Sequence, residues 1–441
     1  MSKGSYFFLK KFMEIEAHEV KATAASFLFV FILMASYYIM HPARDAIASD
    51  WSDGEVSLLW TISFVASFGI VALYGYVISN VRFHYALPAV YSFFAASFLL
   101  FYLYFHFSSD RTFVDKVFYV WLSVFSLFHV SVFWSFMSDI FSKAQAKRLF
   151  DTIAAGASAG AIVGPSIPTL LASNVGADTL LLFSAILLIV PVFLIMYLNK
   201  LKHTELHNDS VHADLSPVKI GGNMFSGFKL FLTSPFLLAI AAFIFLYTAI
   251  DAFVYFEQKN LLAGYDRTTR TQILGGIDWI TNVLTFSLAF FVTSRMVQKA
   301  GMGLTLASLP LLMVVAFLVL AAAPMVLVLV VLQVVRRSGN YSIVRPAREM
   351  LFTEVDRESR FKAKPVIDIV VYRGGNMVSG WLFAGLTTGL GLGVVGMALV
   401  GTVIAAIWCA CGLYLGKYFE ASNKSQDINQ KLLDEQIHNQ V

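Results

Sequence analysis

Apolar runs of about 20 residues recur along the whole chain and are separated by short polar breaks. Each run is long enough to cross about 30 Å of hydrocarbon as an α-helix, which satisfies its own backbone hydrogen bonds in lipid. The pattern therefore predicts an all-α integral membrane protein with twelve transmembrane helices. We place these spans at residues 22–46, 55–79, 85–106, 113–138, 150–172, 178–199, 235–256, 271–294, 302–321, 324–343, 365–388 and 392–416.

The composition agrees with a membrane protein. Of the 441 residues, 58% are hydrophobic and 14% are charged, whereas a soluble domain has about 25% charged residues. The formal net charge of +4 is small for this length and gives no argument for a nucleic acid polymer as partner. Both cysteines, Cys409 and Cys411, lie in the last apolar run, where we expect packing residues rather than a disulfide or a metal site.

The chain divides into two halves. A polar linker at 200–233 separates six spans from six, giving bundles at 22–199 and 234–416 with an arm at 1–21 and a tail at 417–441. Segments four and ten both end at a charged hinge that leads into a glycine-bearing span. This pseudo-symmetric 6+6 bundle resembles the major-facilitator architecture, in which the solute path runs between the halves. We expect the tail to be frayed.

Basic residues are unevenly distributed over the loops. Lys and Arg gather in the arm, the even-numbered loops and the tail, while the other loops have few. The 257–270 loop is the exception, with Lys259, Arg267 and Arg270. The distribution predicts that both termini are cytoplasmic. No cleavable signal peptide is evident, because the first apolar run is too long for one, which fits a bacterial inner membrane.

Charged residues inside apolar spans are costly and usually mark function, so they are the first candidates. Arg44 and Asp45 follow Pro42 near the end of span one, just after the polar and aromatic Tyr38. We interpret Arg44 as an anion-binding residue that faces the path. The alternative is an interfacial pair that caps the helix.

Two aspartates lie in the second half of the chain. Asp251 in span seven has apolar residues on both sides, so it is protonated, paired across the two halves or exposed to water. Its role is either to couple transport to a proton or a substrate, or to form a structural ion pair. Asp278 in span eight poses the same question, and His129 and Trp134 in span four are candidates to line the path.

The stretch from Ser338 to Gly380 carries further charge. Arg345, Arg348 and Glu349 follow span ten, and arginine is suited to gripping phosphate or carboxylate. The alternative is a cytoplasmic hinge held by interhelical salt bridges, with Glu349 and Asp356 as the acidic partners. Asp368 and Arg373 lie five apart in span eleven and face different sides of the helix, so we expect their partners on other helices. Arg373 is a further candidate to line the path.

Other motifs limit the function. Gly156, Gly160 and Gly164 recur every four residues in span five, a spacing that lets helices pack closely. The sequence has no GxxxxGK[ST] phosphate loop, HExxH, CxxC or nucleophile elbow. We therefore expect neither an enzyme nor a nucleotide-hydrolysing pump, and we expect no metal or cofactor.

Three stretches resemble motifs of the ATP:ADP antiporter family, the nucleotide transporters of plastids and obligate intracellular bacteria. They are YYIMHPARDAIASDW, VSVFWSFMSDIFSKAQAKRLF and NYSIVRPAREMLFTEVDRESRFKAKPVIDIVV. The resemblance covers most of the chain and implies a twelve-helix, major-facilitator-like fold that exchanges nucleotides without a cofactor. Arg44 stands where the family has a lysine, Asp251 where it has a glutamate, and Tyr119 where it has an acidic residue. A further family lysine has no counterpart in span nine.

The most concrete hypothesis is a monomeric, bilayer-embedded antiporter for an anionic, phosphate-bearing solute such as ATP or ADP. It would work by alternating access about a site near the midplane. One alternative is a proton-coupled permease or exporter for another organic solute, such as a siderophore, drug or metabolite, with Asp251 as the proton site. A second alternative is a membrane scaffold or receptor that transports nothing.

Overall fold

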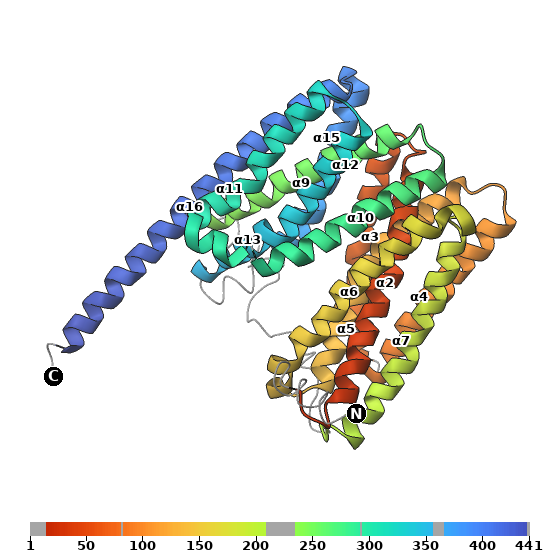
Figure 1. Cartoon of the computed structure of the whole chain (residues 1–441), viewed down its shortest axis with the longest axis horizontal. Helices are drawn as coiled ribbons and strands as arrows, with labels where there is room; N and C mark the ends of the chain where they lie inside the picture. Colours follow the sequence, from red (N-terminus) through yellow and green to blue (C-terminus); the bar gives the residue numbers. More distant parts are fainter. Residues whose placement is uncertain (1–14, 81–82, 209–233, 292, 356–365, 439–441) are drawn as a thin grey trace. The chain divides into compact units, whose positions relative to one another are not determined.

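Helical segments stand at all twelve predicted positions, in the predicted order (Figure 1). The computed structural model describes residues 15–80, 83–208, 234–291, 293–355 and 366–438, and within them the fold contains no β-strand. Nine of the described helices are long and apolar enough to cross a membrane. The predicted fold class is confirmed.

Nine of the twelve segments are single helices: α2 (Val20–Ala48), α3 (Asp53–Asn80), α4 (Phe83–Phe107), α5 (Thr112–Ile140), α6 (Lys143–Val175), α7 (Thr179–Thr204), α9 (Pro235–Leu262), α10 (Arg267–Phe291) and α16 (Val394–His438). α11 (Thr293–Ala322) is kinked at Gly301, where φ is 81°. The remaining two are composite and contain π-helical turns: α12 (Val326–Gly339), η1 (Asn340–Val344), α13 (Arg345–Leu351) and η2 (Phe352–Glu354) form the tenth, and η3 (Val366–Val371), α15 (Tyr372–Ala384) and η4 (Gly385–Gly389) the eleventh.

The chain forms two compact units, which we describe separately. Unit 1 comprises residues 1–52, 58–217 and 262–282. Unit 2 comprises residues 53–57, 218–261 and 283–441. The first part of α10 therefore packs with the helices of unit 1, and the first turn of α3 packs with unit 2.

In unit 1, α6 lies directly on the backbone of α2 through its glycines. A Cβ atom built on Gly164 would lie 2.8 Å from the carbonyl oxygen of Ala35, and one built on Gly156 would lie 2.5 Å from that of Phe27. At Gly160 it would overlap the carbonyl oxygen of Phe31. Only glycine permits this approach, so the interpretation of these glycines as packing residues is confirmed.

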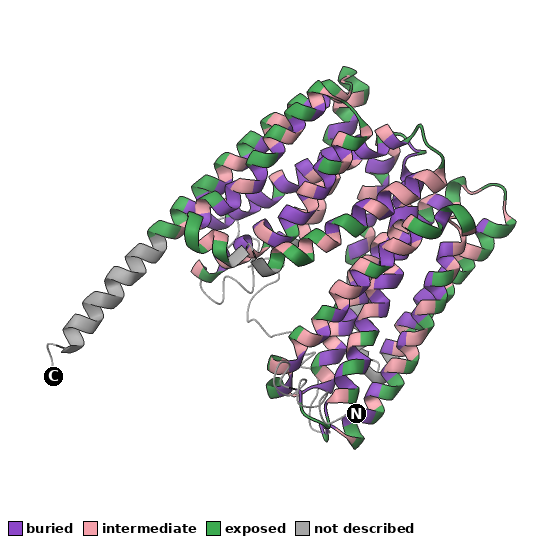
Figure 2. Ribbon diagram, in the orientation of Figure 1, coloured by how far each residue is buried: buried purple, intermediate pink, exposed green. Residues whose placement is uncertain are grey.

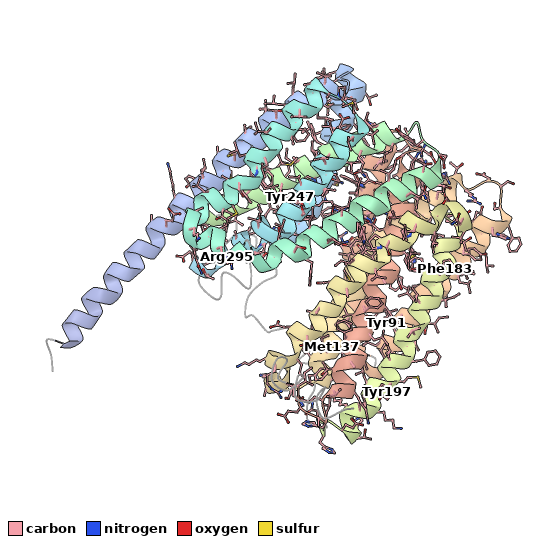
Figure 3. The ribbon with its side chains drawn as sticks, viewed as in Figure 1. Tyr91, Met137, Phe183, Tyr197, Tyr247 and Arg295 are labelled. Atoms are coloured by element: carbon pink, nitrogen blue, oxygen red, sulfur yellow. The ribbon has the colours of Figure 1, made fainter. Side chains whose placement is uncertain are left out.

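Aromatic rings fill the space between α2, α4 and α5. The ring of Phe29 meets Tyr91 edge-on at 5.5 Å and Phe133 at 5.0 Å between centroids. The phenol of Tyr91 donates to the carbonyl of His129 at 3.0 Å. Figure 3 labels Tyr91 within the first bundle. The helices alternate buried and exposed residues along their length (Figure 2). Large apolar side chains such as Phe193 and Leu170 are exposed. This outward apolar surface is what a lipid-facing bundle requires.

In unit 2, α11 and α16 cross at a second glycine contact. A Cβ atom on Gly416 would overlap the backbone of Gly303. One turn on, the side chain of Glu420 accepts the backbone N–H of Met302 at 3.1 Å, next to the kink at Gly301. The carboxylate thus caps the helical segment that restarts after the kink.

Two predicted boundaries are wrong. The tenth helical segment continues past residue 343 as far as Glu354, because the π-turn η1 keeps the backbone hydrogen-bonded across Asn340–Val344. The last helix also runs beyond Lys417 to His438, where we had expected a frayed tail. The stretch after Lys417 contains no glycine and no proline, the two residues that most disfavour a helix. No residue in it therefore breaks the helix. Most of the predicted central linker, residues 209–233, lies outside the described residues.

Glu19, just before α2, ties the start of this helix to α6. Arg148 donates to its two carboxylate oxygens at 2.8 and 3.1 Å. Burial alone would raise the pKa of Glu19, but the hydrogen bonds and charge of Arg148 and the backbone N–H of Glu16 outweigh burial and lower it.

The lowered pKa of Glu19 predicts a pH-dependent stability. The folded value lies below the ordinary value of about 4.3, so the pair stabilises the fold above that value, and its contribution disappears as pH falls through the folded pKa. We expect Glu19→Gln to unfold at a lower temperature than the wild type at about pH 7, with the difference shrinking toward about pH 3. Thermal unfolding in detergent at a series of pH values measures this. A difference that stays constant over the series would contradict it.

Candidate functional site

Arg44 and Asp45 lie on the last turns of α2, where they face α5. Nε and Nη2 of Arg44 both donate to Oδ1 of Asp45, at 2.9 and 2.6 Å. Nη1 donates to the hydroxyl of Ser123 at 3.3 Å, and the guanidinium lies 5.0 Å from the ring centroid of Tyr119. The side chains are only 12% and 8% exposed, so the pair lies inside the bundle, with the arginine oriented by Asp45, Ser123 and Tyr119.

His41 precedes Asp45 by one helical turn and connects it to α10. Its Nδ1 lies 2.7 Å from Oδ2 of Asp278, and its Nε2 lies 3.5 Å from Oδ2 of Asp45. A neutral imidazole has one donor and one acceptor nitrogen, so it can donate to both carboxylates only after it takes up a proton. We call His41, Arg44, Asp45 and Asp278 the unit 1 cluster. It places a guanidinium and an imidazole against two carboxylates.

An aromatic layer borders the unit 1 cluster. Tyr38 meets the rings of Tyr37 at 5.2 Å and His41 at 6.0 Å. His129 stacks under Tyr37 at 4.9 Å and on Phe125 at 5.2 Å, and it is 6% exposed. The structure thus brings the predicted residues Tyr38, Arg44, Asp45 and Asp278 together. His129 adjoins them through Tyr37 and is itself buried in the aromatic layer.

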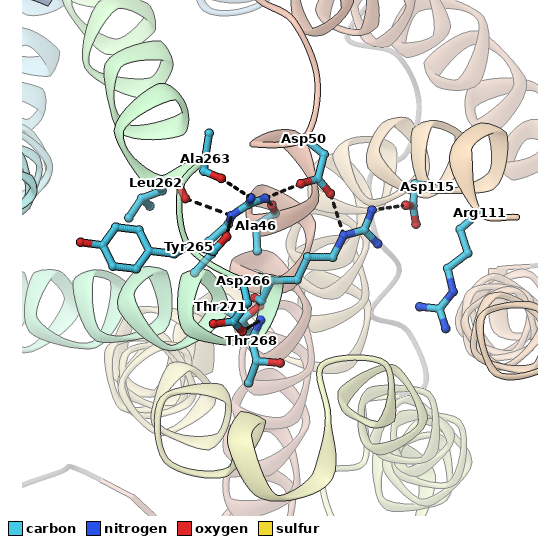
Figure 4. A network of polar contacts seen from close by, with 12 residues as sticks. Ala46, Asp50, Arg111, Asp115, Leu262, Ala263, Tyr265, Asp266, Thr268 and Thr271 are labelled. Carbon is cyan, nitrogen blue, oxygen red and sulfur yellow. Dashed lines mark hydrogen bonds and ion pairs between the residues drawn. The ribbon is translucent and has the colours of Figure 1, made fainter. Parts of the chain in front are cut away.

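A second polar network in unit 1 holds the turn between α9 and α10 (Figure 4). Arg270 donates to Asp50 at 2.5 Å and to four backbone carbonyls at 2.7–3.1 Å: those of Ala46, Leu262, Ala263 and Tyr265. Arg267 bridges Asp50 at 2.7 Å and the buried Asp115 at 2.9 Å. In unit 2, Lys259 pairs with Asp53 at 2.9 Å. These ion pairs give each basic residue of the 257–270 loop a carboxylate partner, which offers a physical reason for the exceptional charge of that loop.

In unit 2 the predicted residue Asp251 pairs with an arginine that the sequence did not single out. Both residues belong to the same unit, so this ion pair lies within one half and not across the halves as expected. Oδ1 of Asp251 on α9 lies 2.5 Å from Nη1 of Arg336 on α12. Nε and Nη2 of Arg336 donate to the side-chain oxygen of Gln333 at 3.0 and 2.8 Å, and Nη1 also donates to the phenol of Tyr247 at 3.3 Å. We call these four residues the unit 2 cluster (Figure 3 labels Tyr247).

The remaining predicted residues lie apart from both clusters. On α13, Arg345 is exposed, and Arg348 pairs with the adjacent Glu349 of the same helix at 2.7 Å. Arg373 is half-buried on α15. The side chain of Asp368 and the whole of Asp356 lie outside the described residues.

The sequence did not single out His41 or Arg336, each of which contacts at least one carboxylate of a cluster. A signal for Arg336 existed, because Gln333 and Arg336 are three residues apart and therefore share one face of the last turn of an apolar span. Among the described residues, no group of three or more His, Cys, Asp and Glu side chains has the arrangement of a metal site.

The comparisons with known proteins decide the family. The model of the Major Facilitator Superfamily matches residues 22–353. The chain belongs to this superfamily. The family and its fold are those of membrane transporters of small solutes rather than of enzymes.

Two relatives are named ADP,ATP carrier protein 1. The one from Chlamydia muridarum is 22% identical, with 94% of this chain and 91% of the relative covered. The one from Chlamydia pneumoniae is 23% identical over 73% of this chain and 71% of the relative. The similarity agrees with the motif resemblance to the ATP:ADP antiporters.

Solved structures share the fold. The nucleoside transporter NupG superposes with a TM-score of 0.62 at 13% identity, covering 93% of this chain and 100% of that chain. A bacterial homologue of the iron transporter ferroportin reaches 0.60 at 10% identity, covering 88% and 99%. At these identities the solved structures show the fold, and they carry no information about the solute.

Proposed function

We propose that this transporter exchanges an anionic, phosphate-bearing solute such as ATP or ADP by alternating access. We place it in a bacterial inner membrane, with both termini in the cytoplasm and two six-helix halves joined by the 200–233 linker. The proposal combines the chemistry of the unit 1 cluster with the similarity to the two ADP,ATP carriers.

The observation that carries the proposal is the setting of Arg44. It is a nearly buried guanidinium on a membrane-spanning helix, oriented by Asp45, Ser123 and Tyr119. Charge at such a position is costly and is found where it binds a solute or an ion. The planar fork of arginine matches two phosphate oxygens at once, which makes an anion with a phosphate group the fitting ligand.

A proton-coupled carrier is the second candidate, and His41 favours it. The imidazole lies between Asp45 and Asp278 and can bond both only as the imidazolium. In that case uptake would follow a pH gradient and would need no counter-substrate.

The test is uptake of radiolabelled ATP and ADP into proteoliposomes, with and without unlabelled nucleotide inside. We expect uptake that saturates and rises when nucleotide is inside. Arg44→Ala should reduce it at least about tenfold, because a hydrogen bond to a charged group contributes about 1.5–3 kcal/mol. Arg44→Lys should retain part of the uptake, because it keeps the charge and loses only the fork.

Arg295→Ala is the matched control, since it removes an exposed arginine far along the chain on α11 and should leave uptake unchanged. Uptake that ignores internal nucleotide but follows an imposed pH gradient would favour the proton-coupled alternative. Absence of any nucleotide uptake by folded protein would refute the nucleotide proposal.

A further inference from the structure

The unit 2 cluster has the features of a second anion site. We propose that Asp251 and an anionic phosphate group of the solute compete for the same place on Arg336. This inference rests on the proposed function, because it assumes that the solute carries such a group, and it assigns Arg336 as a binding residue.

The guanidinium of Arg336 is fixed by neutral groups as well as by Asp251. Gln333 accepts two of its N–H groups and Tyr247 accepts a third, while the ring of Tyr247 lies 5.9 Å from the guanidinium carbon. Arg336 is 2% exposed, so packing also restricts it. The guanidinium would therefore keep its position if Asp251 withdrew, and its N–H groups would remain aimed at an incoming anion.

Asp251 is the more accessible member of the pair. Its side chain is 24% exposed, while that of Arg336 is 2% exposed. Between Tyr247 and Lys259, all residues of α9 are buried except Asp251 and Tyr255, which lie one turn apart. Within 247–259, the partly exposed positions of this helix thus carry a carboxylate and a phenol instead of apolar side chains. Such positions suit a water-filled path and not lipid.

The backbone next to Arg336 is also unusual. The π-helical turn η1 begins at Asn340, whose N–H is shared between the carbonyls of Arg336 and Arg337. π-turns inside α-helices occur frequently at functional sites, because the wider turn redirects the neighbouring side chains. This feature is independent of the ion pair and marks the same place.

The two clusters occupy equivalent positions in the sequence of helices. In unit 1, Arg44 and Asp45 lie on the first span and contact Ser123 and Tyr119 on the fourth. In unit 2, Asp251 lies on the seventh span and contacts Arg336 on the tenth. Each half therefore pairs an arginine with an aspartate where its first and fourth spans meet, which is the arrangement expected if each half contributes one anion-binding arginine.

The charges of Asp251, Arg336 and the solute couple solute binding to the ion pair. A buried guanidinium without a countercharge is strongly unfavourable, so Asp251 can leave only when another anion replaces it. In the wild type the carboxylate competes with the solute, weakens its binding and helps to expel it. Without the carboxylate, binding should be tighter and release slower.

Three variants of the full-length protein test this: Asp251→Asn, Arg336→Gln and the double variant. Thermal unfolding in detergent is followed with increasing inorganic pyrophosphate, with sodium chloride at matched ionic strength as the control. We expect Asp251→Asn to bind pyrophosphate at least about tenfold more tightly than the wild type. The double variant, which has no charge at the pair, should bind at least about tenfold more weakly than the wild type.

If Asp251→Asn does not fold, the wild type and the double variant, which leaves neither charge unpaired, still decide the question. Equal pyrophosphate affinity in these two proteins overturns the proposal, and so does an Asp251→Asn affinity no higher than that of the double variant. Exchange of ADP in proteoliposomes separates this result from the proposed function. The expected pyrophosphate pattern without ADP exchange would retain the site and reject nucleotide exchange. Full ADP exchange by the double variant would retain exchange and reject the site.

Discussion

Gly160→Leu should prevent α6 from packing on α2 and should leave little folded, monodisperse protein. Even a Cβ atom at residue 160 would overlap the carbonyl oxygen of Phe31 and lie 3.0 Å from the Cβ of Met34. Because the obstacle is a backbone group, a change of side-chain rotamer cannot relieve it, and the two helices must separate. Overpacking costs about 1–3 kcal/mol where side chains can adjust. We expect a larger loss here, because separation would also break the contacts at Gly156 and Gly164.

The measurement is the fraction of purified protein that elutes as a single species, together with its unfolding temperature. Gly69→Ala is the matched control: Gly69 lies on an exposed face of α3, and a Cβ atom there would meet nothing within 4 Å. The control should be neutral or stabilised by up to about 1 kcal/mol, since alanine favours helix over glycine. Gly160→Leu protein as stable as the control would show that the close helix crossing is unnecessary.

The order and position of the helices could be predicted from hydropathy, because crossing lipid demands long apolar runs. The glycine spacing in span five also identified the contact on α2. The end of the tenth span could not be predicted well. Arg345 and Arg348 look like the end of a membrane helix, but the helical backbone continues through a π-turn to Glu354, and one arginine is paired with Glu349.

Charged residues were found individually, but their partners were not. Asp251 was recognised because its neighbours are apolar, whereas Arg336 sits near the end of a span, where a basic residue is ordinary. Likewise, Asp278 was noted, but its contact with His41 joins residues 237 positions apart in the sequence. A single sequence contains no direct signal for a contact between residues so far apart. The pairing of charged residues on different helices can therefore be identified only from the fold.

Arg270→Met should be the most damaging change in the network of Figure 4, with a loss of about 3 kcal/mol or more. The guanidinium satisfies three carbonyls at the end of α9 and the following turn, namely those of Leu262, Ala263 and Tyr265. The last carbonyls of a helix have no partner inside it, so without Arg270 they must find water in a place where the arginine itself is 6% exposed. Asp50 loses one of its two arginines but keeps Arg267. The carbonyl groups, and not the ion pair, therefore make up most of the expected loss.

Two further variants separate these contributions. Arg270→Lys keeps the charge beside Asp50 but cannot reproduce the fork that reaches several carbonyls, so it should recover only a minor part of the stability. Arg295→Met makes the same substitution at an exposed arginine and should change the unfolding temperature little.

Hydrogen exchange of the amides in 262–270 should speed up in Arg270→Met before global unfolding, because this turn loses its anchor to α2 through Ala46 and Asp50. If Arg270→Lys were as stable as the wild type, charge pairing would account for the anchor. If exchange in the turn stayed slow in Arg270→Met, the network would have no part in holding it.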